Sequence, residues 1–222
     1  MVMKMRKEII QRVLEHKVVA IVRGVYGEDC LNLARALCEG GIKLLEVTFD
    51  QLNTEKWQDT ADTISLLKSQ LSDVMCFGAG TVTSVELVNI ARSAGADFIV
   101  SPDINKDVIK ATVKGGMVSM PGAMTPTEVL HAHSLGADFV KLFPAGSLGA
   151  GYIKAISAPI NHVKILAVGG IDENNAADFI GAGAVGVGAG GKLVNKKWIA
   201  EGKWDQITAL AKLFTKGVKE NG

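Results

Sequence analysis

Residues 137–144 read Ala-Asp-Phe-Val-Lys-Leu-Phe-Pro, and this stretch places one lysine, Lys141, inside a short apolar run. Gly136 precedes the run and Pro144 ends it, which predicts a buried strand of about five residues. Lysine is rarely buried without a partner, and desolvation disfavours its charged form. An uncharged amine on a rigid strand is the nucleophile that Schiff-base enzymes use. The alternative is a structural lysine whose stem bends out to water.

The same cue, a glycine followed by alanine or glycine and then an apolar run, recurs along the chain. It stands at Gly95, Gly115, Gly136 and Gly183. Together with the lysine strand, short apolar runs predict strands over residues 18–22, 42–49, 74–77, 97–100, 117–120, 164–168 and 184–187, each followed by a helical pattern. Nearly continuous apolar strands indicate a parallel sheet that is covered on both faces.

Eight such units in a chain of 222 residues predict an α/β protein, a (β/α)8 TIM barrel. We expect one domain over residues 1–222, with an extra amphipathic helix over residues 1–16. A doubly wound open sheet is the competing fold. It would need a GxGxxG turn after its first strand, and residues 23–27 read Arg-Gly-Val-Tyr-Gly instead.

Two motifs predict where helices begin. Thr125-Pro126-Thr127-Glu128 forms a capping box with proline at the first helical position. Asp172, directly after Gly169-Gly170-Ile171, is predicted as the N-cap of the next helix.

The bulk composition excludes several classes of protein. A formal net charge of +1 without any basic stripe argues against nucleic acid as a partner. Residues 179–191 form the longest weakly polar run, which is too short and too rich in glycine to cross a membrane. Residues 1–16 lack the apolar core of a signal peptide. Cys30, Cys38 and Cys76 form no CxxC pair and indicate a reduced, cytoplasmic protein.

In a (β/α)8 barrel the active site lies at the carboxyl ends of the strands. The residues predicted there are Arg23, Glu46 with Thr48, Gly80-Thr81, Ser101-Pro102, Pro121, Lys141 and Gly169-Gly170. Glu46 and Lys141 are charged residues within apolar strands, and such groups in a cleft point to a site. The structural alternatives are a buried Glu46–Lys141 ion pair, which is costly to desolvate, and an Arg23 that caps a helix.

Seven segments, in order, resemble the 2-keto-3-deoxy-6-phosphogluconate (KDPG) and 2-keto-4-hydroxyglutarate (KHG) aldolase family. They are Ile21-Val22-Arg23, Leu45-Glu46-Val47-Thr48-Phe49, Gly78-Ala79-Gly80-Thr81-Val82, Ile99-Val100-Ser101-Pro102, Met120-Pro121-Gly122, Val140-Lys141-Leu142-Phe143-Pro144-Ala145 and Val168-Gly169-Gly170-Ile171. The combination of Glu-Val-Thr-Phe with Lys-Leu-Phe-Pro is the specific part of the match.

The resemblance implies a metal-free class I aldolase, usually trimeric, that splits a 2-keto-4-hydroxy acid into pyruvate and an aldehyde such as glyceraldehyde 3-phosphate or glyoxylate. It implies no cofactor, because Lys141 itself forms a covalent imine. Glu46 would be the proton shuttle. Arg23, Thr81 and Pro102 would hold or enclose the pyruvate end, and Phe143 would line the pocket. Gly169, Gly170, Gly190 and Gly191 would hold a phosphate through their backbone amides.

The sequence departs from the family pattern at two positions that concern phosphate. Gly191 stands where a serine is common, and Asp50 stands where some relatives carry arginine. Both changes predict weakened phosphate preference and a broad enzyme, active within about tenfold on unphosphorylated substrates. Val168 looks more like the phosphogalactonate branch of the family than the phosphogluconate branch.

Three other functions remain open at this point. They are a phosphogalactonate-type keto-deoxy aldolase, a phosphate-binding barrel isomerase or synthase that does not use Lys141, and a non-catalytic barrel that binds phosphorylated metabolites. The last two need no buried amine beside a carboxylate. No metal site is expected: His131 and His133, two residues apart on a predicted helix, do not share a face.

Overall fold

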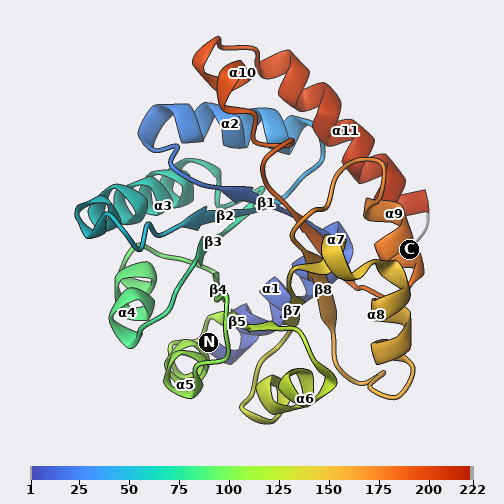
Figure 1. Cartoon of the computed structure of the whole chain (residues 1–222). Coiled ribbons are helices and arrows are strands. Elements are labelled where there is room, and N and C mark those ends of the chain that lie inside the picture. Colours follow the sequence, from blue (N-terminus) through green and yellow to red (C-terminus); the bar gives the residue numbers. More distant parts are fainter. Residues whose placement is uncertain (1, 221–222) are drawn as a thin grey trace.

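The computed structural model describes residues 2–220, with the side chains of residues 6–220, and its strands form one parallel sheet around a central axis (Figure 1). The strands are β1 (Val18–Val22), β2 (Leu44–Thr48), β3 (Cys76–Gly80), β4 (Phe98–Val100), β5 (Val118–Met120), β6 (Gly122–Ala123), β7 (Val140–Leu142), β8 (Ile165–Val168) and β9 (Gly186–Ala189). The strand order follows the chain, with β1 between β2 and β9. Met1 and residues 221–222 of the predicted domain lie outside the described residues.

The strands β5 and β6 are two pieces of one barrel strand, separated only by Pro121. β5 pairs with β4 and β6 pairs with β7, so the sheet closes through this segment. The backbone N–H of Lys141 donates to the Pro121 carbonyl at 2.9 Å. Proline has no N–H to donate, so it interrupts the ladder without opening the barrel. The predicted (β/α)8 barrel is confirmed, with its fifth strand in two pieces.

Helices cover the outside of the barrel between successive strands (Figure 1). They are α2 (Gly27–Glu39), the 3-10 turn η1 (Thr54–Lys56), α3 (Trp57–Leu71), α4 (Val85–Ser93), α5 (Lys106–Lys114), α6 (Pro126–Ser134), α7 (Ala145–Leu148), α8 (Ala150–Ser157), α9 (Ala176–Gly181), α10 (Lys196–Ala200) and α11 (Trp204–Glu220). The capping box predicted at Thr125 and Glu128 is present at the start of α6.

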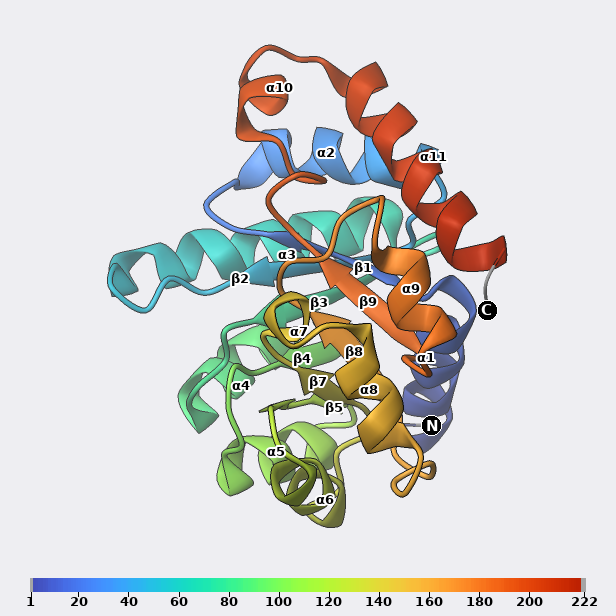
Figure 2. The same cartoon turned by 45° about the vertical axis from the view of Figure 1, so that its right-hand side comes forward.

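The helix α1 (Val2–His16) is the predicted extra helix, and it lies at the end of the barrel where the strands begin (Figure 2). Val13 of α1 is fully buried in the same apolar cluster as Val19 and Phe98 inside the barrel. Arg6 of α1 binds both carboxylate oxygens of Asp138, at 2.8 and 2.9 Å. The helix therefore closes this end, and the opposite face is left for ligands.

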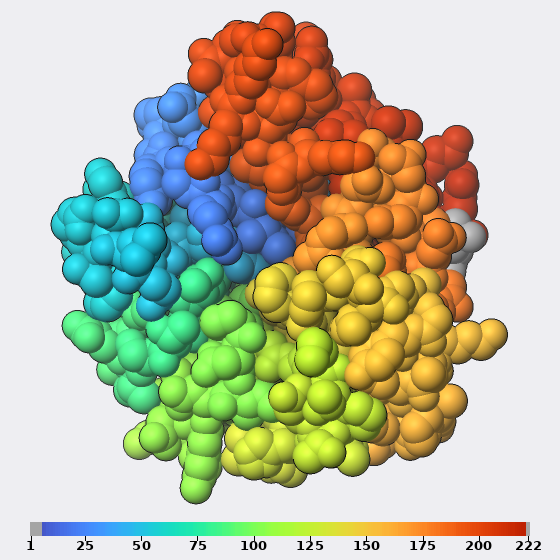
Figure 3. Space-filling model, viewed as in Figure 1, coloured from blue at the N-terminus to red at the C-terminus, as the bar shows by residue number. Residues whose placement is uncertain are grey.

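Side chains along each strand alternate between the barrel interior and the helix layer. In β2, Leu44 belongs to the interior cluster, whereas Leu45 and Val47 belong to the outer one. By this alternation Glu46 and Thr48 also face the interior, nearer the carboxyl end of the strand. The space-filling view shows that face, where segments from early, middle and late parts of the chain meet around the centre (Figure 3).

Two sequence predictions about local structure are wrong. The third strand does not end before Gly78 but continues to Gly80, because both glycines give room inside the barrel: a Cβ on Gly78 would overlap the Phe98 ring, and one on Gly80 would overlap the Glu46 carboxylate. Asp172 is not a helix N-cap, since α9 begins after Asn175. The short helices α7 and α10 were not predicted, because their few residues carry no clear periodicity.

Candidate active site

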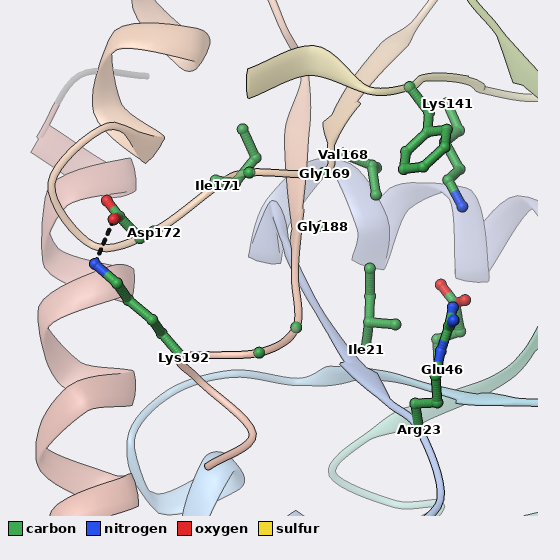
Figure 4. Close-up of a pocket in the computed structure, with 14 residues that line it drawn as sticks. Ile21, Arg23, Glu46, Lys141, Val168, Gly169, Ile171, Asp172, Gly188 and Lys192 are labelled. Atoms are coloured by element: carbon green, nitrogen blue, oxygen red, sulfur yellow. Dashed lines mark hydrogen bonds and ion pairs between the residues drawn. The ribbon is translucent and has the colours of Figure 1, made fainter. Parts of the chain in front are cut away.

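Lys141 and Glu46 come from β7 and β2, and their side chains point into the same space at the open end of the barrel (Figure 4). Lys141 is 9% exposed and Glu46 is 3% exposed. Among the described residues, neither the Lys141 amine nor the Glu46 carboxylate has a hydrogen-bond or ion-pair partner. The predicted alternative of a direct Glu46–Lys141 ion pair is therefore not present. Both groups are free to meet a ligand.

The environment of Glu46 favours its protonated form. Burial raises the pKa of this carboxyl above its ordinary value, while the positive charges of Lys141 and Arg23 oppose the shift. A carboxyl whose pKa is raised above its ordinary value keeps its proton to a higher pH, so it can serve as a proton donor as well as an acceptor. The arrangement therefore suits general acid–base chemistry next to an amine.

Phe143 forms the wall beside Lys141. The Lys141 Nζ atom lies 5.2 Å from the centroid of the Phe143 ring, within the range of a cation–π contact. The ring packs against Gly169, where a Cβ would come within 2.9 Å of it and where φ is +90°. Gly169 therefore needs to be glycine both for its backbone conformation and for the position of Phe143.

A cavity of about 380 Å³ connects these groups. Its lining includes Ile21, Arg23, Glu46, Lys141, Phe143, Val168, Gly169, Gly170, Ile171, Asp172, Gly188, Gly190, Gly191 and Lys192. A volume of this size fits a small metabolite. Of the ten residues to which the family resemblance gives a role, the structure brings eight into this cavity.

Thr81 and Pro102 are the two of these ten residues that do not line it. Thr81, which has a positive φ of +56°, accepts a hydrogen bond from Gln51 through its carbonyl. Pro102 lines a neighbouring cavity, which shares Phe143 with the first. Their predicted contacts with the pyruvate end stay predictions.

The two glycine turns of the cavity present backbone amides that are suited to an anion. In the part of the chain that the structure describes, the N–H groups of Gly170, Ile171, Gly191 and Lys192 donate to no protein acceptor. The Asn175 side chain fixes the first turn, because it accepts from the Asp172 N–H at 2.9 Å and donates to the Gly170 carbonyl at 2.9 Å. Unpaired amides that converge on a cavity are suited to phosphate or carboxylate.

Sequence reasoning missed the pair of charges at this end of the cavity. Lys192 Nζ lies 2.6 Å from Asp172 Oδ2 and 4.0 Å from Glu173 Oε1. Each residue of the Lys192–Asp172 pair follows a glycine turn, and these turns follow β8 and β9, which are neighbours in the sheet. The rule that adjacent parallel strands bring their carboxyl ends together could have found them.

The structure also corrects the reading of Asp50. Its carboxylate accepts hydrogen bonds from the backbone N–H groups of Leu52 and Asn53 and from the Asn53 side-chain amide. These bonds, that of the Asn53 side chain foremost, lower the pKa of Asp50. Asp50 fixes its own loop and does not line the cavity, so it does not subtract charge from a phosphate site there.

The described residues contain neither a metal-binding cluster nor a membrane-spanning helix. Within residues 6–220, no three histidine, cysteine, aspartate or glutamate side chains are grouped so that they could hold a metal ion. None of the helices described here has the length and apolar character needed to cross a membrane.

The sequence matches the family described as KDPG and KHG aldolase over residues 9–210. It is 36% identical over 205 residues to a 2-dehydro-3-deoxy-phosphogluconate aldolase from Treponema pallidum, covering 92% of this chain and 93% of that one. It is 32% identical to a 2-dehydro-3-deoxy-6-phosphogalactonate aldolase from Escherichia coli, covering 90% and 96% of the two chains.

The fold is similar to that of a KDPG aldolase from Legionella pneumophila, solved with pyruvate captured at low pH as a covalent carbinolamine intermediate. The TM-score is 0.81 at 29% sequence identity, and the match covers 91% of this chain and 96% of that one.

Proposed function

Because this chain belongs to the KDPG and KHG aldolase family, we propose that it is a class I aldolase that cleaves a 2-keto-3-deoxy acid with a C4 hydroxyl into pyruvate and an aldehyde. The observation that carries this proposal is that the buried Lys141 amine, which makes no hydrogen bond or ion pair within the described residues, shares one cavity with the buried Glu46 carboxyl. A phosphate-binding isomerase or a non-catalytic barrel gives no reason for this pair.

The reaction begins when the lone pair of Lys141 Nζ attacks the C2 ketone of the substrate. The resulting carbinolamine loses water, which Glu46 assists by giving a proton to the departing hydroxyl. The product is a protonated imine between Lys141 and C2. This imine acts as an electron sink and makes the next bond cleavage possible.

Cleavage then occurs between C3 and C4. The Glu46 carboxylate accepts the proton of the C4 hydroxyl, the C3–C4 bonding electrons move into the imine, and the aldehyde leaves. Glu46 returns this proton to C3 of the remaining enamine, and hydrolysis of the resulting imine releases pyruvate and restores the Lys141 amine. General acid–base assistance of this kind is typically worth about 10²–10⁴ in rate.

Other residues of the cavity would orient the substrate. Arg23 offers a guanidinium that suits the carboxylate of the pyruvate end. Val168 lines the cavity next to Gly169, and its apolar side chain cannot hydrogen-bond a substrate hydroxyl. We therefore include the phosphogalactonate-type substrate as the second candidate, which differs in the configuration at C4. Relative kcat/KM values for the two C4 epimers distinguish these candidates.

The test is borohydride reduction in the presence of pyruvate, followed by peptide mass mapping. We expect one pyruvate-derived group on the peptide that contains Lys141, and no adduct in Lys141→Ala. Lys43→Ala is the control, because Lys43 is a half-buried lysine that lies outside the cavity, and this variant should keep the adduct. An adduct on another lysine, or none, contradicts the proposal. Turnover should also survive EDTA, because the imine supplies the electron sink that a metal would otherwise provide.

The proposal extends to a cytoplasmic homotrimer. Cys30, Cys38 and Cys76 are unpaired thiols, which suits a reducing compartment. Met124 and Leu130 are exposed apolar side chains on and beside α6 and could serve an interface between copies. Size-exclusion chromatography with light scattering measures the mass directly, and a monomer would contradict this part.

A further inference from the structure

Lys192 has no role in the chemistry at Lys141, yet its amine lies in the same cavity, held by Asp172. We propose that Lys192 leaves Asp172 to bind the terminal phosphate of the substrate, and that this exchange sets the preference for phosphorylated over unphosphorylated substrates. The inference rests on the proposed aldolase function and names a specificity-determining residue for it.

Lys192 is placed to contact the end of the substrate that is farthest from Lys141. Lys192 and Asp172 stand on the opposite side of the cavity from Lys141 and Glu46 (Figure 4). A substrate held as an imine on Lys141 must therefore reach across the cavity to touch Lys192. The 6-phosphate of a six-carbon keto-deoxy acid is at that far end, whereas a five-carbon dicarboxylic acid ends sooner.

The surroundings of Lys192 supply the rest of a phosphate site. The unpaired N–H groups of Gly170, Ile171, Gly191 and Lys192 belong to the same two turns. Apart from its two chain neighbours, none of the described residues comes within 4 Å of where a Cβ on Gly191 would stand, so its backbone is open to a close approach by an anion. Lysine is a common partner of phosphate as a mobile point charge.

The charges around Lys192 explain why only a phosphate would break its ion pair with Asp172. Lys192 Nζ lies 2.6 Å from the Asp172 carboxylate and 4.0 Å from that of Glu173, so two carboxylates lie on one side of an amine that is otherwise open to solvent. A neutral terminal hydroxyl cannot displace a carboxylate from an ammonium. A doubly charged phosphate that also receives four backbone N–H groups can. When Lys192 moves, the Asp172 carboxylate keeps its hydrogen bond from the Asn174 N–H at 3.0 Å and remains partly exposed to water.

The first experiment compares kcat/KM for 2-keto-3-deoxy-6-phosphogluconate and unphosphorylated 2-keto-3-deoxygluconate. Lys192→Met should lower the ratio of the two values roughly 10- to 100-fold, which is the usual range for losing one charged hydrogen bond. Asp172→Asn keeps an acceptor for Asn174 but frees Lys192, so it should raise the ratio.

Lys203→Met is the matched control. Lys203 forms an ion pair of the same length, 2.6 Å, with Glu201, and lies outside the cavity. It should leave the ratio within twofold of that of the parent protein. If Lys192→Met and Lys203→Met have the same ratio of kcat/KM values for the phosphorylated and unphosphorylated substrates, the inference is overturned.

A second measurement separates this inference from the aldolase proposal. Inorganic phosphate binding, measured by calorimetry, does not depend on catalysis or on Lys141. The parent protein and Lys203→Met should bind phosphate equally, and Lys192→Met should bind it at least tenfold more weakly. Equal binding by all three overturns the inference even if pyruvate is trapped on Lys141. Conversely, phosphate binding that depends on Lys192 without a pyruvate adduct leaves the phosphate site standing and refutes the aldolase.

Discussion

Glu46 is a buried carboxyl that has no hydrogen-bond partner in the described part of the chain, and a fold alone does not require such a group. Its raised pKa arises first from burial, against the opposing charges of Lys141 and Arg23. The same desolvation that suits proton transfer therefore weakens the folded state. Replacing Glu46 with a group of the same shape that cannot ionise should therefore lower activity and raise stability.

Glu46→Gln should lower kcat by about 10²-fold or more, because the amide cannot shuttle a proton. It should also raise the melting temperature at neutral pH. The folded state binds the Glu46 proton more tightly than the unfolded state, so stability falls as pH rises above the ordinary value of 4.5. The gain from Glu46→Gln should thus fade as pH falls towards 4.5. Calorimetry between pH 4.5 and 8 measures this gain in melting temperature. A Glu46→Gln variant with normal kcat would show that Glu46 has a structural role only.

The residues of the site were predictable to different degrees for a physical reason. Lys141 and Glu46 were found because a charge inside an apolar strand is rare, so its position carries information. Lys192 and Asp172 were missed because charged residues are ordinary in turns. Asp50 was misread, since only the structure shows that its carboxylate bonds to Leu52 and Asn53 in its own loop.

At the scale of elements, β3 controls the site without supplying a side chain to it. Gly80 pairs with Thr48 of β2, and a Cβ at Gly80 would overlap the Glu46 carboxylate. Gly78 stands in the same strand and faces the same way, but its Cβ would meet the Phe98 ring. One strand therefore offers two comparable substitutions with different neighbours.

Gly80→Ala should lower kcat by at least tenfold, because Glu46 must move away from the position that faces Lys141. Borohydride trapping of pyruvate on Lys141 should be affected less than turnover. Gly78→Ala is the control: it crowds Phe98 in the apolar interior and should cost about 1–3 kcal/mol of stability. Steady-state kinetics and thermal melts separate the two effects. If Gly80→Ala keeps its kcat, the position of Glu46 is not critical.

The limits of the elements show why local patterns mislead in a barrel. Gly78-Ala79-Gly80 is a turn signal by composition, but the narrow interior needs residues without side chains, so the strand continues through it. Pro121 likewise signals a strand end, yet β6 continues the fifth strand beyond it. The number and order of strands follow from the apolar runs, whereas their ends depend on neighbours that only the closed barrel brings together.

The two ends of the barrel have different roles, one in ligand binding and the other in stability. The cavity lies where the strands end, and α1 closes the end where they begin (Figure 2). At that closed end Asp138 precedes β7, the strand of Lys141. Its carboxylate accepts from Arg6 of α1 and from the backbone N–H of Ser119 at 2.9 Å. Asp97 makes the same arrangement before β4, with Lys68 and the N–H of Phe77.

Asp138→Asn should therefore destabilise the protein without changing its chemistry. Hydrogen bonds to charged groups contribute about 1.5–3 kcal/mol each, and the Asp138 side chain is only 9% exposed. We expect a fall in melting temperature of about 4–10 °C for a domain of this size. Glu201→Gln breaks an exposed ion pair with Lys203 and should change it by no more than about 2–4 °C. Measured well below either melting temperature, kcat should stay within twofold of the parent value in both variants. A large loss of kcat in Asp138→Asn with an unchanged melting temperature would show that the closed end positions Lys141, and the division between the two ends would be wrong.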